Sequence, residues 1–148
     1  MVDVREGDPG VAFAHRCALC GSGDHGRPVV ADGFVSLTRA LGRVFVARSD
    51  RPVGVDAEPI AAGDERVRAI GRLTGVWSAE HWTRVEAVLK ADGRGLAVDP
   101  GRVRVEGDRA ELDGVRYRLR RHPFDAALVV TTAVRDDGTG TGLGAGRR

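Results

Sequence analysis

The run from Ser78 to Gly93 constrains the fold more than any other part of this sequence. Its apolar residues recur at helical spacing and form one stripe, which comprises Trp82, Val85, Val88 and Leu89. Ser78 is a favoured N-cap residue, Glu80 adds negative charge to the first turn, and Gly93 is a typical helix end. The run therefore predicts a well-defined amphipathic helix that packs its stripe against another layer.

Short strand patterns lie on both sides of this helix. They cover residues 33–37, 43–48 and 52–58 before it, and 102–106, 110–113, 115–120 and 126–134 after it. Residues 61–75 predict a further helix. The polar turn at 49–52 predicts a hairpin between the second and third strands, and Asp113-Gly114 predicts another. This order of elements predicts an α+β fold in which an antiparallel sheet packs against two helices.

The 148 residues are enough for one domain. Residues 1–16 show no clear pattern and are expected to form an irregular lead-in. Residues 17–136 form the predicted domain. In residues 137–148, five of the twelve residues are glycine, so this tail is expected to be disordered.

The composition argues against two classes of partner. The 23 basic and 21 acidic residues give a net charge of +2, and aromatic residues make up 5% of the chain. Such a mixed surface predicts no nucleic-acid partner and no membrane partner. The first ten residues do not resemble a secretory signal, and the two cysteines fit a reducing compartment. We therefore expect a cytoplasmic protein.

Three acidic residues and the only lysine of the chain form the candidate site. Asp56 and Glu58 are two apart in the predicted strand, so their carboxylates share one face. Glu86 and Lys90 follow Trp82 at helical spacing and lie on one stripe. If strand and helix meet, this set suits a divalent cation and a phosphate ester. The alternatives are a solvated strand edge, a surface pair on the helix and a tryptophan of the core.

Four segments resemble motifs of the 4′-phosphopantetheinyl transferase superfamily, in its surfactin-type branch. They are His25-Gly-Arg-Pro28, Val35-Ser-Leu-Thr-Arg-Ala40, Gly54-Val-Asp-Ala-Glu58 and the run from Trp82 to Leu96. They are similar to the family's His-Gly-Arg/Lys-Pro segment, its Ser-Leu-Ser-His-Ser strand, its Gly-Val/Ile-Asp-x-Glu motif and its Trp-Thr-x-Lys-Glu-Ala-x-x-Lys-x-x-Gly-x-Gly-Leu motif. The four segments follow the family's order, and the last two together are specific.

The resemblance implies an enzyme with the fold of a phosphopantetheinyl transferase half-unit. Such an enzyme moves 4′-phosphopantetheine from coenzyme A to a serine of an acyl or peptidyl carrier protein, with Mg²⁺ as the metal. The metal ligands would be Asp56, Glu58 and Glu86. Lys90 would hold the phosphate, and Glu86 could also take the serine proton. The residues that would contact the nucleotide end of coenzyme A are Arg27, Thr38 and Arg39.

The chain also departs from the family's pattern. Val85 stands where the family has a lysine, and Arg39 stands where it has a histidine. Most of the first of the family's two halves is absent. The chain is then a compact variant, a homo-oligomer that replaces the missing half, or a decayed relative or fragment. The alternative function is a non-catalytic relative that binds coenzyme A or a carrier protein.

A cysteine and histidine cluster forms a second group of interest. Cys17, Cys20 and His25 resemble part of a zinc knuckle, and His15 is a candidate fourth ligand. The plainer alternative is a pair of reduced thiols.

Arginines alternate along one predicted strand. Arg116, Arg118 and Arg120 share one face, with Arg121 beside them. This face is either solvated or a docking surface for an acidic carrier protein. An arginine-rich nucleic-acid module with a zinc knuckle is the remote alternative function.

Overall fold

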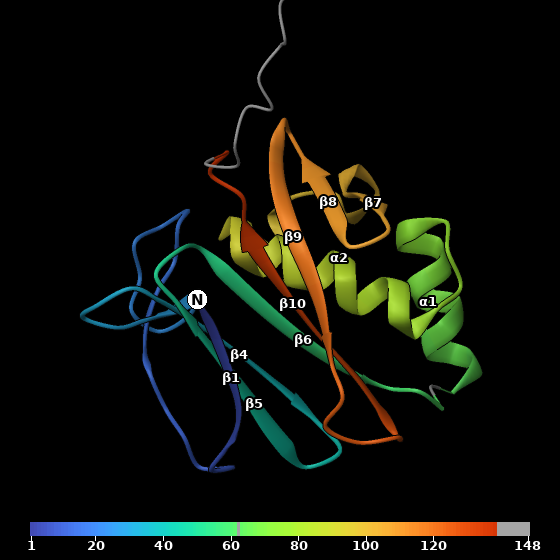
Figure 1. The fold of residues 1–148 in the computed structure, drawn as a ribbon, viewed down its shortest axis with the longest axis horizontal. Helices are drawn as coiled ribbons and strands as arrows, with labels where there is room; N and C mark the ends of the chain where they lie inside the picture. Colours follow the sequence, from blue (N-terminus) through green and yellow to red (C-terminus); the bar gives the residue numbers. More distant parts are fainter. Residues whose placement is uncertain (62, 139–148) are drawn as a thin grey trace, which may run out of the picture.

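The computed structural model describes residues 1–61 and 63–138 (Figure 1). The strands are β1 (Val2–Gly7), β2 (Ala14–Arg16), β3 (Arg27–Val29), β4 (Phe34–Ala40), β5 (Arg43–Ser49), β6 (Val53–Pro59), β7 (Arg104–Glu106), β8 (Arg109–Leu112), β9 (Val115–His122) and β10 (Leu128–Arg135). The helices are α1 (Asp64–Thr74) and α2 (Ala79–Asp92), followed by short 3-10 helices at Gly95–Ala97 and Pro100–Arg102. The antiparallel sheets and two helices confirm the predicted α+β class.

The strands form three antiparallel sheets. Their orders are β1-β5-β4, β6-β10-β9-β8-β7 and the two-stranded ribbon β2-β3. The predicted hairpin between residues 43–48 and 52–58 is therefore wrong, because β5 pairs with β4 and β1 whereas β6 pairs with β10. The other edge of β6 is bonded by side chains. The amide of Val55 donates to the hydroxyl of Ser36, and its carbonyl accepts from Lys90.

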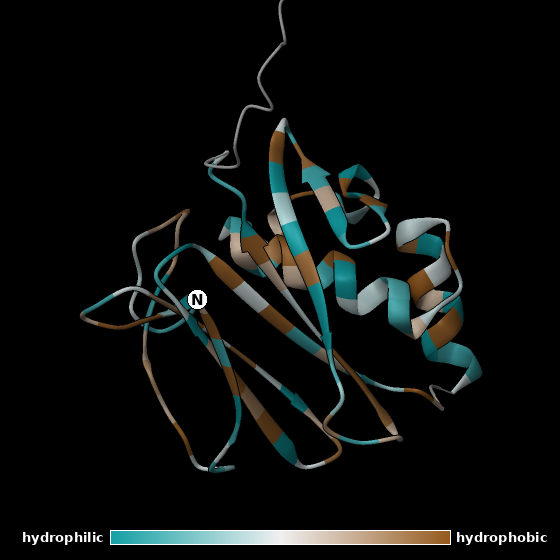
Figure 2. Ribbon diagram, in the orientation of Figure 1, coloured by the Kyte–Doolittle hydropathy of each residue, from teal (hydrophilic) through white to brown (hydrophobic). Residues whose placement is uncertain are grey.

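Two apolar clusters lie on opposite faces of the five-stranded sheet. One cluster lies between this sheet and α2 and includes Val85, Leu89 and Ala133. The other lies against the three-stranded sheet and includes Phe45, Val55 and Val130. Figure 1 shows α2 running across one face of β9 and β10, and Figure 2 shows hydrophobic residues along β6 and β10. β6 is thus buried on both faces, which favours pairing with the equally apolar β10.

The helix α2 begins and ends as the sequence predicts. The hydroxyl of Ser78 accepts a hydrogen bond from the amide of His81 at 3.2 Å, and Gly93 ends the helix in the left-handed conformation. The whole predicted apolar stripe of α2 is buried. Trp82 is 7% exposed, which confirms its alternative interpretation as a core residue.

The expected irregular lead-in at residues 1–16 is wrong. It contains β1, which pairs with β5 over its whole length, and β2, which pairs with β3. Val2 and Val4 pack against the core while the charged residues between and after them face outward. Residues 139–148 of the predicted Gly-rich tail lie outside the described residues. In the part of the chain that the structure describes, no helix is long and apolar enough to cross a membrane.

Candidate functional site

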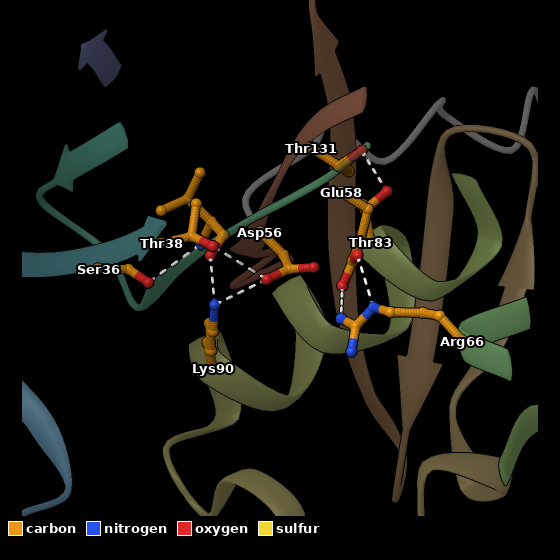
Figure 3. Close-up of polar contacts among 9 residues, drawn as sticks. Ser36, Thr38, Asp56, Glu58, Arg66, Thr83, Lys90 and Thr131 are labelled. Carbon is orange, nitrogen blue, oxygen red and sulfur yellow. Dashed lines mark hydrogen bonds and ion pairs between the residues drawn. The ribbon is translucent and has the colours of Figure 1, made fainter. Parts of the chain in front are cut away.

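The acid pair of β6 is buried. Asp56 is 5% exposed and Glu58 is 3% exposed, so the alternative of a solvated strand edge is wrong. Both carboxylates lie on the helix side of β6 (Figure 3). Val55 and Ala57, which alternate with them along the strand, belong to the core on the opposite face. This confirms the prediction that the two acidic side chains share one face.

A glycine allows α2 to approach this strand closely. A Cβ atom on Gly54 would lie 1.9 Å from the carbonyl oxygen of Ala87 and 2.7 Å from the amide nitrogen of Ala91. Only a residue without a side chain fits at this position. The close approach brings Glu86 and Lys90, which lie on either side of Ala87 in the helix sequence, to the acid pair.

Lys90 bonds directly to β6. Its ammonium group donates to Asp56 Oδ1 at 2.9 Å and to the carbonyl oxygen of Val55 at 3.0 Å (Figure 3). The hydroxyl of Thr38 donates to the same oxygen of Asp56 at 3.2 Å. Because an ammonium group has three N–H donors, one remains for a ligand. The alternative of a plain surface pair between Glu86 and Lys90 is wrong, because Lys90 pairs with Asp56 instead.

Arg66 holds the second acid of the strand. This arginine lies in the first turn of α1, and its Nε donates to Glu58 Oε2 at 2.9 Å while Nη2 contacts Oε1. The pair is bidentate, which is the strongest arrangement of an arginine on a carboxylate. The side chain of Arg66 is itself 56% exposed. Glu58 is therefore neutralised by a cation that reaches it from the solvent side.

Two carboxylate oxygens of the site have no such partner. Asp56 Oδ2 and Glu86 Oε2 are buried and accept no hydrogen bond from any described residue. Desolvation raises the pKa of Glu86 most strongly; Lys90 opposes this shift, and the nearby Asp56 and Glu58 add to it. Desolvation likewise raises the pKa of Asp56 against the effect of Lys90. Both groups would be stabilised by a proton or a cation.

The residues present fit a divalent cation in part. Oxygen ligands are what Mg²⁺ prefers, and the free oxygens of Asp56 and Glu86 supply two of them. The oxygens of Glu58 are taken by Arg66. Among residues 1–61 and 63–138, no grouping within 4.8 Å includes all three carboxylates, so they lie further apart than metal ligands do. The metal role of this set stays a prediction.

A cavity of about 480 Å³ opens beside Lys90. Arg27 and Lys90 both line it, and Arg27 comes from β3. The guanidinium group of Arg27 lies over the ring of Phe34, 5.6 Å from the ring centre, and close to Gly93 at the end of α2. The cavity is thus a space with two cationic side chains next to the acid cluster.

The other two predicted nucleotide contacts do not line this cavity. Thr38 is buried and bonds to Asp56. Arg39 is exposed on the opposite face of β4 and donates to the carbonyl oxygen of Val11 at 3.2 Å. The structure therefore brings Arg27 and Lys90 together at the cavity, and Thr38 to the acid cluster, but not Arg39.

Val85 stands where the transferase motif that the chain resembles has a lysine, and its side chain carries no charge. Its side chain is fully buried in the core between α2 and the sheet. A lysine here would have to bury its charge or leave the core. The departure noted in the sequence is therefore part of the packing of α2.

Sequence reasoning missed two residues of the site. Arg66 is one of 22 arginines among the 23 basic residues, and nothing local distinguishes it. Ser36 bonds the free edge of β6 through its hydroxyl, which is a long-range contact. Only the helical position of Arg66, eight residues after Glu58, could have suggested that it reaches back to the acid pair.

The cysteine and histidine cluster is assembled at the end of the β2–β3 ribbon. Ligand atoms of Cys17, Cys20 and His25 lie within 4.8 Å of one another, and Cys20 Sγ is 3.3 Å from His25 Nε2. Backbone N–H groups of Cys20 and Leu19 directed at its sulfur lower the pKa of Cys17 to about 7. His15, the candidate fourth ligand, lines the same cavity as Cys17 but lies outside this group.

The arginines of β9 lie on the outer face of the sheet. Arg116, Arg118 and Arg120 are exposed, whereas Tyr117 and Leu119 between them are buried. The predicted shared face is confirmed, and its role stays a prediction.

No protein-family model matches the chain, and no curated protein matches it.

Proposed function

We propose that this protein transfers 4′-phosphopantetheine from coenzyme A to a serine of an acyl or peptidyl carrier protein, with Mg²⁺. One observation supports this most strongly. Asp56 and Glu86 each keep a buried carboxylate oxygen that has no partner among the described residues, and Lys90, which bonds to Asp56, also lines the 480 Å³ cavity. Unpartnered buried carboxylate oxygens are costly, and a bound cation would compensate for them.

The cavity suits the nucleotide end of coenzyme A. Arg27 and Lys90 supply positive charge along its wall, and a phosphate is held well by a guanidinium fork or an ammonium point charge. The lining also includes apolar groups such as Leu37 and Leu89, which suit the flat faces of a base. Arg27 is fixed by its contact with Phe34, so this cation is positioned before a ligand arrives.

The transfer assigns distinct tasks to these side chains. Asp56 and Glu86 would hold Mg²⁺ through their unpartnered oxygens, and Glu58 would join them only once Arg66 releases it. The ion would neutralise charge on the pyrophosphate when bound. Lys90 holds the phosphate through its remaining N–H donor. The carrier's serine oxygen forms a bond to the phosphorus that bears pantetheine, and the bond from that phosphorus to 3′,5′-ADP breaks. The serine proton passes to Glu86, the carboxylate of α2 that keeps an unpartnered oxygen.

The decisive experiment incubates the protein with coenzyme A, MgCl₂ and an apo carrier protein. We expect the carrier serine to gain phosphopantetheine, as seen by intact-protein mass spectrometry. Glu86→Gln keeps the shape of the side chain and is expected to lower the rate at least about 100-fold, because general-base catalysis alone contributes that much. Glu80→Gln is the matched control, since Glu80 lies on the same helix in a partly exposed pair with Arg84, away from the acid cluster. A carrier that stays unmodified with the wild-type protein would overturn the proposal.

A second candidate function is binding of coenzyme A without transfer. Two observations favour it: Val85 is buried where the family has a cation, and Arg66 occupies both oxygens of Glu58. Calorimetric titration with 3′,5′-ADP separates the two functions. Binding that is lost in Arg27→Ala, together with an unmodified carrier, would favour the binding protein.

A further inference from the structure

The loop between β2 and β3 has a defined backbone. The amide of Cys17 donates to the carbonyl of Ser22, and the amide of Gly21 donates to the carbonyl of Cys17, both at 2.9 Å. Gly26 closes the loop with a φ of 98°, and a Cβ atom there would lie 2.4 Å from the carbonyl oxygen of Arg16. The ten residues from 17 to 26 therefore form a compact loop with its own backbone hydrogen bonds.

This loop has little apolar packing to hold it. Cys20 and His25 are exposed, Leu19 is 73% exposed, and no residue of the loop belongs to either apolar cluster. Loops of this kind are commonly held by a disulfide or a metal instead of a core. Both cysteines are free thiols here. The loop thus lacks the usual means of support while bringing three ligating side chains together.

The distances among these side chains are close to those of a tetrahedral site. Zinc bonds of about 2.3 Å to sulfur and about 2.0 Å to nitrogen place neighbouring ligand atoms roughly 3.5–3.8 Å apart. The ligand atoms of Cys17, Cys20 and His25 already lie within 4.8 Å of one another. Small side-chain rotations would therefore complete the coordination without moving the backbone.

The ligand types select the metal. Thiolate and imidazole are soft or intermediate ligands that suit Zn²⁺, whereas Mg²⁺ and Ca²⁺ take oxygen. No carboxylate belongs to this group in the described part of the chain.

We propose that Cys17, Cys20 and His25 bind one Zn²⁺ ion, with a water molecule as the fourth ligand on the cavity side. Cys17 and His25 line the same cavity as Arg27 and Lys90, so the ion would fix one wall of that cavity. His25 and Arg27 are separated only by Gly26, and the ion thereby also restrains the start of β3. This zinc site does not depend on the transferase proposal.

The test measures zinc affinity of the full chain in a reducing buffer, by competition with a chromophoric chelator. We expect one zinc ion per chain. Cys20→Ser is expected to weaken the affinity by more than about 100-fold, since loss of even an outer partner of a metal site costs 10- to 100-fold. Asp24→Asn is the matched control, because Asp24 is exposed in the same loop and lies outside the ligand group. Its affinity is expected to equal that of the wild type.

Cobalt substitution of the wild-type protein provides a second measurement that needs no variant. Co²⁺ is expected to give the thiolate-to-metal charge-transfer absorption of a site with two cysteines, and Zn²⁺ is expected to displace it. Equal zinc affinity in the wild type and Cys20→Ser would overturn the proposal. So would a cobalt spectrum without charge transfer, or a Cys17–Cys20 disulfide that persists in the reducing buffer.

Discussion

The contact region between β6 and α2, which contains Asp56, Glu58, Glu86 and Lys90 and is called the seam below, differs sharply from the β2–β3 ribbon and its loop. The seam buries Asp56 and Glu58, and the chain supplies its own cations to neutralise them. The ribbon exposes Cys20 and His25 and supplies no partner other than the loop itself. Lys90 of the seam and Cys17 and His25 of the ribbon line the same cavity. The acid cluster of the seam is therefore held in place by packing and persists without a ligand, whereas the order of the cysteine and histidine cluster depends on what it binds.

Substitution of one glycine in each region is expected to give the largest difference in stability between the seam and the ribbon. Gly54→Ala would place a Cβ atom 1.9 Å from the carbonyl oxygen of Ala87, and only movement of α2 can relieve that clash. We expect the free energy of unfolding to fall by at least about 3 kcal/mol, at the upper end of overpacking effects. Chemical denaturation followed by circular dichroism measures this change.

The matched substitution lies in the ribbon. A Cβ atom on Gly23 meets nothing closer than 3.7 Å, so Gly23→Ala is expected to change the free energy of unfolding by less than about 1 kcal/mol. If both variants lost similar stability, the seam would be no more tightly packed than the ribbon, and the contrast would fail.

Removal of the ammonium group from the seam is the next largest effect. Lys90→Met leaves Asp56 buried without its cation, and this is expected to cost about 2 kcal/mol of unfolding free energy at neutral pH. That figure is below the ~3–5 kcal/mol for a fully buried pair, because the side chain of Lys90 is 27% exposed.

The same variant has a predicted pH dependence. Burial already raises the pKa of Asp56 above its unfolded value of 3.8, and loss of Lys90 raises it further. The native state then holds a proton that the unfolded state releases, so stability falls as the pH rises above about 4. Denaturation at a series of pH values measures this slope. Glu86 also has a raised pKa that Lys90 opposes, so the double variant with Asp56→Asn is expected to keep only the part of the slope that Glu86 contributes. A slope of the opposite sign would contradict the assignment.

The sequence predicts local features of this fold better than pairings. The ends of α2 were predictable because Ser78 and Gly93 act on neighbouring backbone groups. The shared face of Asp56 and Glu58 follows from the period of a strand. The partner of β6 was not predictable from the turn at residues 49–52, because it is decided by burial on both faces and by the apolar β10.

The candidate site was likewise predictable only where its residues follow a local pattern of the sequence. A resemblance in residue order indicated Asp56, Glu58, Glu86 and Lys90. It did not indicate Arg66, because only the fold brings α1 back to the acid pair. The direction of Arg39 was likewise missed, although strand alternation places it opposite Thr38. The ion-pair partners of a buried acid, and the oxygens left without a partner, depend on contacts between distant parts of the chain. A local sequence pattern therefore cannot predict them.

The smallest expected effect concerns competition between Arg66 and a cation at the acid cluster. Both oxygens of Glu58 are held by Arg66, whose side chain is 56% exposed. Partly exposed ion pairs are worth about 0.2–1 kcal/mol, so Arg66→Ala is expected to strengthen Mg²⁺ binding by roughly 1.4- to 5-fold. Calorimetric titration with MgCl₂ measures this change.

Arg68→Ala is the control, because it removes the same charge from an exposed position of the same helix without touching Glu58. Weaker Mg²⁺ binding in Arg66→Ala than in Arg68→Ala would mean that Arg66 supports the acid cluster instead of competing for it. In either variant the zinc affinity of the ribbon is expected to stay at the wild-type value, because the soft ligands of that loop share no partner with Glu58.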